Sequence, residues 1–227
     1  MNTSSQLRTG LGCLAIGGVL LTLAGCSSDD PDVTHDGQIS YACALAAHVA
    51  EQDPDMATWT MIGDDADPLV REILAMGSLA GGSAAFELDG KAELSEAGGA
   101  AFQGVSRVDF EAMQTGLDDF GTACESLSVS AEGDVSDEGQ IRFGCDLAAH
   151  VIEEHGAAET WGSLGEETAW HETMSVGSLF GGPVGQVLAD HPDLSAGGQE
   201  LVTGVMTVNP ETLDGGLEAV VDHCDGV

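Results

Sequence analysis

Apolar and polar positions alternate with helical spacing in a twelve-residue segment that occurs twice in the chain, at residues 38–49 and 140–151. Residues at i, i+4, i+7 and i+8 share one face of a helix. That face consists of Tyr41, Leu45, His48 and Val49 in the first segment, and of Phe143, Leu147, His150 and Val151 in the second. Both segments are therefore predicted to be amphipathic helices.

Further matches follow the two segments in the same order, first 102 and then 100 positions apart. They are Trp59 with Trp161, Gly63 with Gly165, Gly77 with Gly177, Ser95 with Ser195, Gly104 with Gly204, and Cys124 with Cys224. So many ordered matches predict a tandem repeat. We assign residues 37–125 to the first repeat, 126–138 to an acidic linker and 139–227 to the second repeat.

Local start and stop signals divide each repeat into helices. Asp53-Pro54 ends the first helix, because the residue before a proline avoids the α conformation. Asp67-Pro68 opens a second helix with a capping side chain and a proline at its first position. The remaining expected caps are Ser95 and Ser195 for a third helix, and Asp109 and Asn209 for a last helix that ends near Cys124 or Cys224. No segment alternates with period two, so we predict an all-α tandem repeat of two disulfide-stapled bundles, each with about four helices.

The composition is strongly acidic, with 39 Asp and Glu, 5 Lys and Arg, and a formal charge of −34. This excludes nucleic-acid binding, which requires cationic side chains to neutralise phosphates. It equally disfavours docking on anionic lipid headgroups. The acids are spread along the chain and apolar residues make up 43%, which is enough for a folded core.

The first 26 residues have the features of a targeting segment. Arg8 precedes an apolar stretch at residues 11–23, which is too short and glycine-rich for a good spanning helix. The stretch ends in Leu23-Ala24-Gly25-Cys26, which resembles the lipobox of bacterial lipoproteins. The resemblance implies removal of the signal peptide, residues 1–25, and attachment of acyl chains to Cys26. Residues 26–36 then form a lipidated, flexible tether, and the protein is expected on the extracytoplasmic face of the cell membrane, which it contacts only through this lipid anchor.

Four of the six cysteines remain when Cys13 leaves with the signal peptide and Cys26 carries lipid. Disulfides are expected outside the cytoplasm, and four cysteines allow three pairings. We favour Cys43–Cys124 with Cys145–Cys224, which treats the repeats identically; the pairings between repeats stay open as alternatives. A metal site formed by Cys43 and His48 with Cys145 and His150 is disfavoured, because side chains five positions apart diverge by about 140° around a helix. No metal or cofactor is expected.

His48, His150, Trp59 and Trp161 are the candidate ligand-binding residues. The two histidines are the only ones shared by both repeats; they could bind haem or a metal or line a pocket, although core histidines hydrogen-bonded to a neighbouring helix are the favoured interpretation. The two tryptophans could stack on a ligand, although anchors in a small-residue core are favoured. The other five histidines, His35, His155, His171, His191 and His223, are expected at the surface or in loops.

Several motifs lack the context that their chemistry requires. The Gly-Ser-Leu-x-Gly-Gly segments at 77–82 and 177–182 have no following Lys-Ser/Thr and no preceding strand, so they predict a helix end or a close helix crossing and not a phosphate loop. Ser78 and Ser178 are not in a nucleophile elbow. The acidic runs at 64–67 and 134–138 do not match a calcium loop.

These patterns predict a non-enzymatic lipoprotein that binds a small ligand through its duplicated unit, since no nucleophile, base and orienting group occur at a recognisable spacing. An interface between duplicated units is a common place for a pocket. The alternative is a structural or protein-docking component of the cell envelope that has no pocket.

Overall fold

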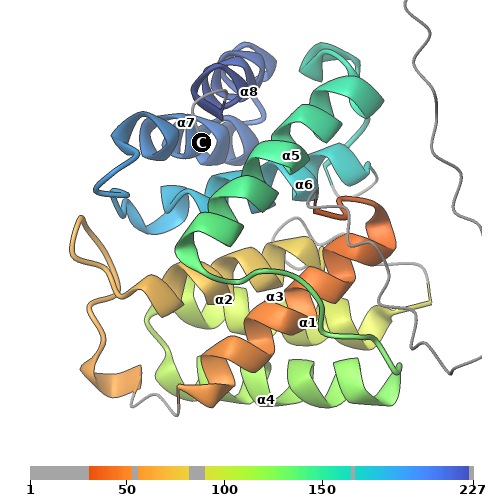
Figure 1. The fold of residues 1–227 in the computed structure, drawn as a ribbon, viewed down its shortest axis with the longest axis vertical. Coiled ribbons are helices and arrows are strands. Elements are labelled where there is room, and N and C mark those ends of the chain that lie inside the picture. Colours follow the sequence, from red (N-terminus) through yellow and green to blue (C-terminus); the bar gives the residue numbers. More distant parts are fainter. Residues whose placement is uncertain (1–30, 53–55, 82–89, 165–166, 225–227) are drawn as a thin grey trace, which may run out of the picture. The chain divides into compact units, whose positions relative to one another are not determined.

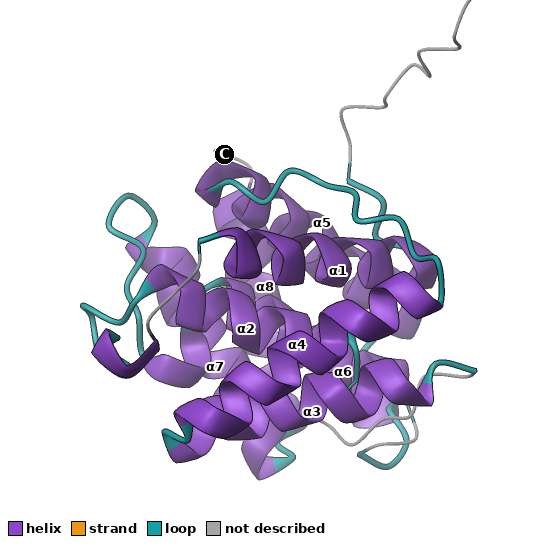
Figure 2. Cartoon of the chain, turned by 90° about the horizontal axis from the view of Figure 1, so that it is seen from below, coloured by secondary structure: helices purple, strands orange, loops and turns teal. Residues whose placement is uncertain are grey.

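Helices follow one another along the whole described part of the chain (Figures 1 and 2). The computed structural model describes residues 31–52, 56–81, 90–164 and 167–224, and within these ranges it contains eight α-helices and no strand. The helices are α1 (His35–Glu51), α2 (Pro68–Leu79), α3 (Ala92–Arg107), α4 (Phe110–Ser126), α5 (Asp137–His155), α6 (Thr168–Leu179), α7 (Pro192–Thr207) and α8 (Pro210–Cys224). The predicted all-α class is confirmed.

Capping side chains begin several of these helices as the sequence predicts. The Asp67 carboxylate accepts a hydrogen bond from the Leu69 N–H at 3.1 Å, and Pro68 is the first residue of α2. Asp109 caps α4 through the Ala112 N–H at 3.1 Å. Asn209 accepts from the Thr212 N–H at 3.3 Å at the start of α8. Each cap satisfies a backbone donor that has no partner within its own helix.

The predicted caps at Ser95 and Ser195 are wrong. Helix α7 begins three residues earlier, at Pro192, because a proline suits the first helical turn, where no N–H is needed. The Ser195 hydroxyl is instead buried and accepts a hydrogen bond from the Leu188 N–H at 2.8 Å. Ser95 likewise lies inside α3, which begins at Ala92.

Two other helix boundaries differ from those expected from the sequence, and several expected features fall outside the described residues. Helices α1 and α5 start at His35 and Asp137, so the last residues assigned to the tether and the linker are helical. Asp53-Pro54, Gly82 and Gly165 lie outside the described residues, and so do residues 1–30 with Arg8, Cys13 and Cys26.

Helix α2 packs against α6, and each of them packs against the helices that follow and precede it in its own half of the chain. Small residues allow these close approaches. A Cβ on Gly77 of α2 would lie 2.6 Å from the Gly98 carbonyl oxygen of α3, and one on Gly177 of α6 would lie 3.0 Å from the Gly198 carbonyl oxygen of α7. Gly81 and Gly181 follow α2 and α6 with φ of 78° and 79°, a left-handed conformation that favours glycine. Both predicted roles of the repeated glycines, ending a helix and permitting a close crossing, are confirmed.

One large buried cluster joins apolar side chains from both halves of the chain. Its largest fully buried members include Phe120, Phe143 and Phe180. A smaller cluster surrounds Trp170 and Met174. The described residues belong to one compact unit, Pro31–Val227.

One disulfide in each half of the chain joins the first helix of that half to its last. Cys43 of α1 is bonded to Cys124 of α4 with a Cα–Cα distance of 6.0 Å, and Cys145 of α5 is bonded to Cys224 of α8 at 5.7 Å. The favoured pairing is thereby confirmed over the pairings between repeats. The bonded sulfurs also exclude the thiolate metal site, since zinc requires deprotonated thiols.

In the part of the chain that the structure describes, no helix is both long enough and apolar enough to cross a membrane.

Candidate functional site

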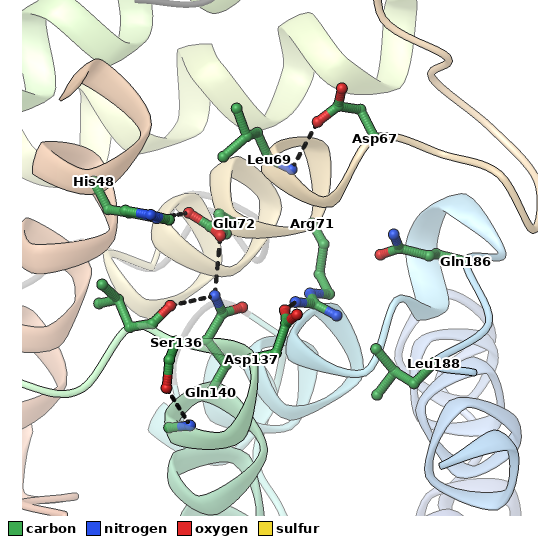
Figure 3. Close-up of polar contacts among 12 residues, drawn as sticks. His48, Asp67, Leu69, Arg71, Glu72, Ser136, Asp137, Gln140, Gln186 and Leu188 are labelled. Carbon is green, nitrogen blue, oxygen red and sulfur yellow. Dashed lines mark hydrogen bonds and ion pairs between the residues drawn. The ribbon is translucent and has the colours of Figure 1, made fainter. Parts of the chain in front are cut away.

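A pocket of about 310 Å³ opens where α1 ends and where α2 and α5 begin. Its lining includes His48 of α1, Asp67 and Glu72 at the start of α2, and Asp137 and Gln140 at the start of α5. Figure 3 shows His48 and Gln140 reaching Glu72 from two different helices. The pocket therefore draws residues from segments that are far apart in the sequence.

Short-range hydrogen bonds fix the part of the pocket wall that α5 contributes. The Asp134 carboxylate accepts hydrogen bonds from the Ser136 N–H at 3.0 Å and the Ser136 hydroxyl at 2.6 Å. The Ser136 hydroxyl in turn accepts from the Gly139 N–H at 3.2 Å and caps α5. These bonds position the first turn of α5, from which Gln140 points to Glu72 (Figure 3).

Glu72 is a buried carboxylate, 3% exposed, with a partner for each oxygen. Its Oε2 lies 2.7 Å from His48 Nδ1, and its Oε1 accepts a hydrogen bond from Gln140 Nε2 at 3.0 Å. Burial raises the pKa of Glu72 above its ordinary value, while the bonds from His48 and Gln140 act in the opposite direction. The Glu72 carboxyl is therefore easier to protonate than an exposed glutamate, and a cation beside it would favour its charged form. We call Glu72, His48 and Gln140 the Glu72 site.

Glu172 of α6 is a second buried carboxylate, 4% exposed, with the same kinds of partner. Its Oε1 accepts from Gln38 Nε2 at 2.8 Å, and its Oε2 lies 2.8 Å from His155 Nε2. Gln38 is in α1, just as Gln140 is in α5, so each glutamine bonds a glutamate of the opposite half. We call Glu172, His155, His150 and Gln38 the Glu172 site.

Other contacts join equivalent positions of the two halves directly. The Ser78 and Ser178 hydroxyl oxygens, 100 positions apart, lie 3.3 Å from each other and are fully buried. The rings of Tyr41 and Phe143 stack with centroids 3.8 Å apart and an angle of 3° between their planes. Self-contacts and reciprocal contacts of this kind are typical of an interface with twofold symmetry.

A buried cation distinguishes the two halves. Arg71, 2% exposed, donates from Nη2 to Asp137 Oδ1 at 2.7 Å beside the pocket (Figure 3). The position 100 residues later holds His171, which is fully buried in α6. Burial lowers the pKa of His171 to about 4, with Glu172 acting in the opposite direction. The expectation that His171 is a surface or loop histidine is wrong, because α6 is buried along its whole length from Ala169 to Leu179.

The structure does not gather the four predicted site residues into one site. His48 lines the pocket with 31% of its side chain exposed. Trp59 is partly buried against the core. His150 and Trp161 lie instead around His155, with ring centroids 6.3 and 6.5 Å from it, and Trp161 packs edge-on against Trp170 at 5.4 Å.

The four buried hydrogen-bonding residues of these sites were not predicted from the sequence, although the repeat contains a signal for them. They are Gln38, Gln140, Glu72 and Glu172. Gln38 and Gln140 open the two copies of the repeated segment, and Glu72 and Glu172 match at the offset of 100. A polar residue repeated inside an apolar helix indicates a buried hydrogen bond. His155 carries no such signal, because Asp53 stands at the matching position. It was expected at the surface or in a loop, but it is the last residue of α5 and its side chain is only 16% exposed.

One group of side chains has the composition of a metal site. Ligand atoms of His150, His155 and Glu172 all lie within 4.8 Å of one another, and no other group of three such residues was found among the described residues. This group and the pocket are two places where the described residues bring chemically active side chains together.

No protein-family model matches the chain, and neither a curated protein nor a solved structure matches it.

Proposed function

We propose that this protein is a non-enzymatic, lipid-anchored binding protein on the extracytoplasmic face of the cell membrane, and that it takes up a small solute with a positively charged nitrogen in the pocket beside Glu72. The observation that carries this proposal is the buried Glu72 carboxylate in the wall of a 310 Å³ pocket. Pockets for small molecules begin at about 300 Å³. The pocket is at the lower end of that range, so the solute is expected to be a small molecule.

The chemistry of the lining favours a cation that donates hydrogen bonds. Asp67, Glu72 and Asp137 supply carboxylates. The Oε1 of Gln140 is buried and has no hydrogen-bond partner among the described residues, so it also requires a donor. A protonated amine offers both a positive charge and N–H donors. The formal charge of −34 would raise the local concentration of such a cation.

The finer architecture belongs to the same proposal. We interpret α1–α4 and α5–α8 as two copies of one disulfide-stapled bundle, packed about a pseudo-twofold axis through α2 and α6. The ordered matches along the chain, the reciprocal Gln–Glu bonds and the contact of Ser78 with Ser178 support this interpretation. The pocket then lies at the interface between the copies, where duplication creates a concave surface.

The membrane anchor rests on the resemblance of residues 23–26 to a lipobox. Two or three acyl chains on Cys26 give stable anchoring, whereas one chain would be marginal. Replacing Cys26 by serine is expected to remove the acyl mass from the protein and to release it from the membrane fraction. A Cys26→Ser protein that keeps the acyl mass would contradict the anchor, independently of what the pocket binds.

The pocket is tested by titrating the full-length protein in detergent with methylammonium, ethanolamine and putrescine, followed by calorimetry. At least one of these amines is expected to bind with saturation, and Glu72→Gln is expected to abolish that binding because it removes the buried charge. Glu51→Gln, which neutralises an exposed acid at the end of α1, is the matched control and should bind as the unmodified protein does. Equal binding by both variants, or no binding of any amine, would contradict the pocket and favour the docking alternative.

A further inference from the structure

We propose that His150, His155 and Glu172 form a binding site for a divalent transition metal ion, of which Zn²⁺ is the best fit. Two imidazoles come from α5 and one carboxylate from α6, and their ligand atoms all lie within 4.8 Å of one another. Imidazole nitrogen and carboxylate oxygen are both ordinary zinc ligands. This site shares no residue with the Glu72 pocket and does not depend on the function proposed for it.

The three ligand atoms lie within 4.8 Å of one another, and a bound metal would have to bring them to a common spacing. Zinc bonds of about 2.0–2.2 Å in tetrahedral geometry place neighbouring ligand atoms roughly 3.3 Å apart. His155 Nε2 and Glu172 Oε2 are now 2.8 Å apart and share a hydrogen bond, which an inserted ion would replace. His150 and His155 are of intermediate burial, whereas Glu172 is buried.

The five-residue spacing of the two histidines does not prevent this arrangement. Side chains so spaced diverge around a regular helix, which disfavoured a metal site at Cys43 and His48. His155, however, is the last residue of α5, and Gly156 after it has a φ of 64°. The rings of His150 and His155 meet edge-on with centroids 6.3 Å apart. The two imidazoles therefore lie near each other although their side chains leave α5 in different directions.

A second layer of contacts holds the carboxylate in place. Gln38 Nε2 bonds Glu172 Oε1 at 2.8 Å and thereby leaves Oε2 directed to His155. Gln38 Nε2 is itself fixed by the Val33 carbonyl at 2.9 Å. Hydrogen bonds that orient a ligand in this way typically contribute about 10- to 100-fold to metal affinity. Three protein ligands leave the fourth position of a tetrahedral ion open to water or a solute.

The experiment titrates full-length protein in detergent, first stripped with EDTA, with Zn²⁺ by calorimetry and with Co²⁺ by visible absorption. Excess Ca²⁺ is present throughout, because it occupies exposed carboxylates but not imidazoles. One equivalent of each metal is expected to bind, and Co²⁺ is expected to give the strong visible bands of a four-coordinate ion. His150→Gln and His155→Gln should each lower the affinity more than about 100-fold, since they remove a direct ligand, and Gln38→Leu by about 10- to 100-fold.

Two control variants separate this site from other acids and histidines. His48→Gln removes the imidazole bonded to Glu72, and His223→Gln removes an exposed histidine near Asp193; both should bind metal as the unmodified protein does. A second readout needs no variant: on adding Zn²⁺, the imidazole nuclear magnetic resonance signals of two histidines should shift together at one equivalent. Absence of binding, or binding that survives both His150→Gln and His155→Gln, would overturn the proposal and assign any bound metal to surface carboxylates.

Discussion

The surroundings of Glu72 and Glu172 show how one sequence pattern produces two different sites. Both carboxylates are buried, and both accept a hydrogen bond from a glutamine of the opposite half. The imidazoles differ in origin, because Glu72 is bonded by His48 from within α1, whereas Glu172 is bonded by His155 from the end of α5. His150, the sequence match of His48, lies beside His155 instead, with the two ring centroids 6.3 Å apart.

The residues next to the two glutamates also differ between the halves. Arg71 is bonded to Asp137, whereas the matching positions in the other half hold His171 and His35. An arginine stays charged at every physiological pH, but a histidine does not. Buried polar contacts shared by both halves therefore maintain the packing, and the residues that differ between the halves define the individual chemistry of each site.

The largest expected effect is the decrease in the free energy of unfolding when either disulfide is removed. The sequence separations are 81 and 79 residues, for which the chain-entropy model gives about 4–5 kcal/mol each. Removing Cys43 and Cys124 together, or Cys145 and Cys224 together, by alanine substitution should lower the free energy of unfolding by nearly the same amount. The measurement is urea denaturation followed by circular dichroism. A reductant breaks the disulfides of the unmodified protein as well, so under reducing conditions the three proteins should be about equally stable. In oxidising buffer, a clear difference in unfolding free energy between the two double variants would show that the halves are not energetically equivalent.

The second prediction concerns His171, which should make the protein less stable in acid. Its pKa is about 4 in the folded protein, lowered mainly by burial and further by His35 and His155, against an ordinary value of 6.5. The unfolded chain therefore binds the proton first, and stability falls as the pH decreases from 6.5 to 4. The loss from this group is roughly 3 kcal/mol, at 1.36 kcal/mol for each pH unit.

His171→Gln tests this contribution, because a glutamine does not titrate. The difference in unfolding free energy between the variant and the unmodified protein, measured with EDTA at several pH values, should shift in favour of the variant as the pH falls. Parallel pH profiles for His171→Gln and the unmodified protein would contradict the assignment.

The smallest expected effect comes from the two glutamines. Gln140→Leu removes the donor to Glu72 Oε1 and to the Val135 carbonyl, and Gln38→Leu removes the donor to Glu172 Oε1 and to the Val33 carbonyl. Buried acceptors left without a donor cost about 1–3 kcal/mol, so both variants should lose stability by similar amounts in metal-free buffer. Gln114→Leu, at an exposed glutamine of α4, should change stability by less than about 0.5 kcal/mol. Unequal losses for Gln38 and Gln140 would break the equivalence of the two sites.

The sequence by itself determined the helical class, the starts of α2, α4 and α8, and the favoured disulfide pairing. These features depend on short-range signals such as the caps at Asp67 and Asp109, or on matches between the two halves of the chain. The start of α7 was missed because a proline and a serine three residues apart are both plausible start signals, and the proline prevailed.

Only the tertiary structure decided which side chains meet at the candidate sites. The glutamines and glutamates that bond each other are 68 and 134 residues apart, so no local pattern pairs them. The end of α5 turns His155, and not His150, onto Glu172, and the burial of α6 on every side changes His171 from an expected surface histidine into a buried one. Burial and long-range hydrogen bonds arise from packing between distant segments, so they are decided only when the chain folds. A helix cap depends on a few neighbouring residues, and a repeat is visible when the two halves of the sequence are compared.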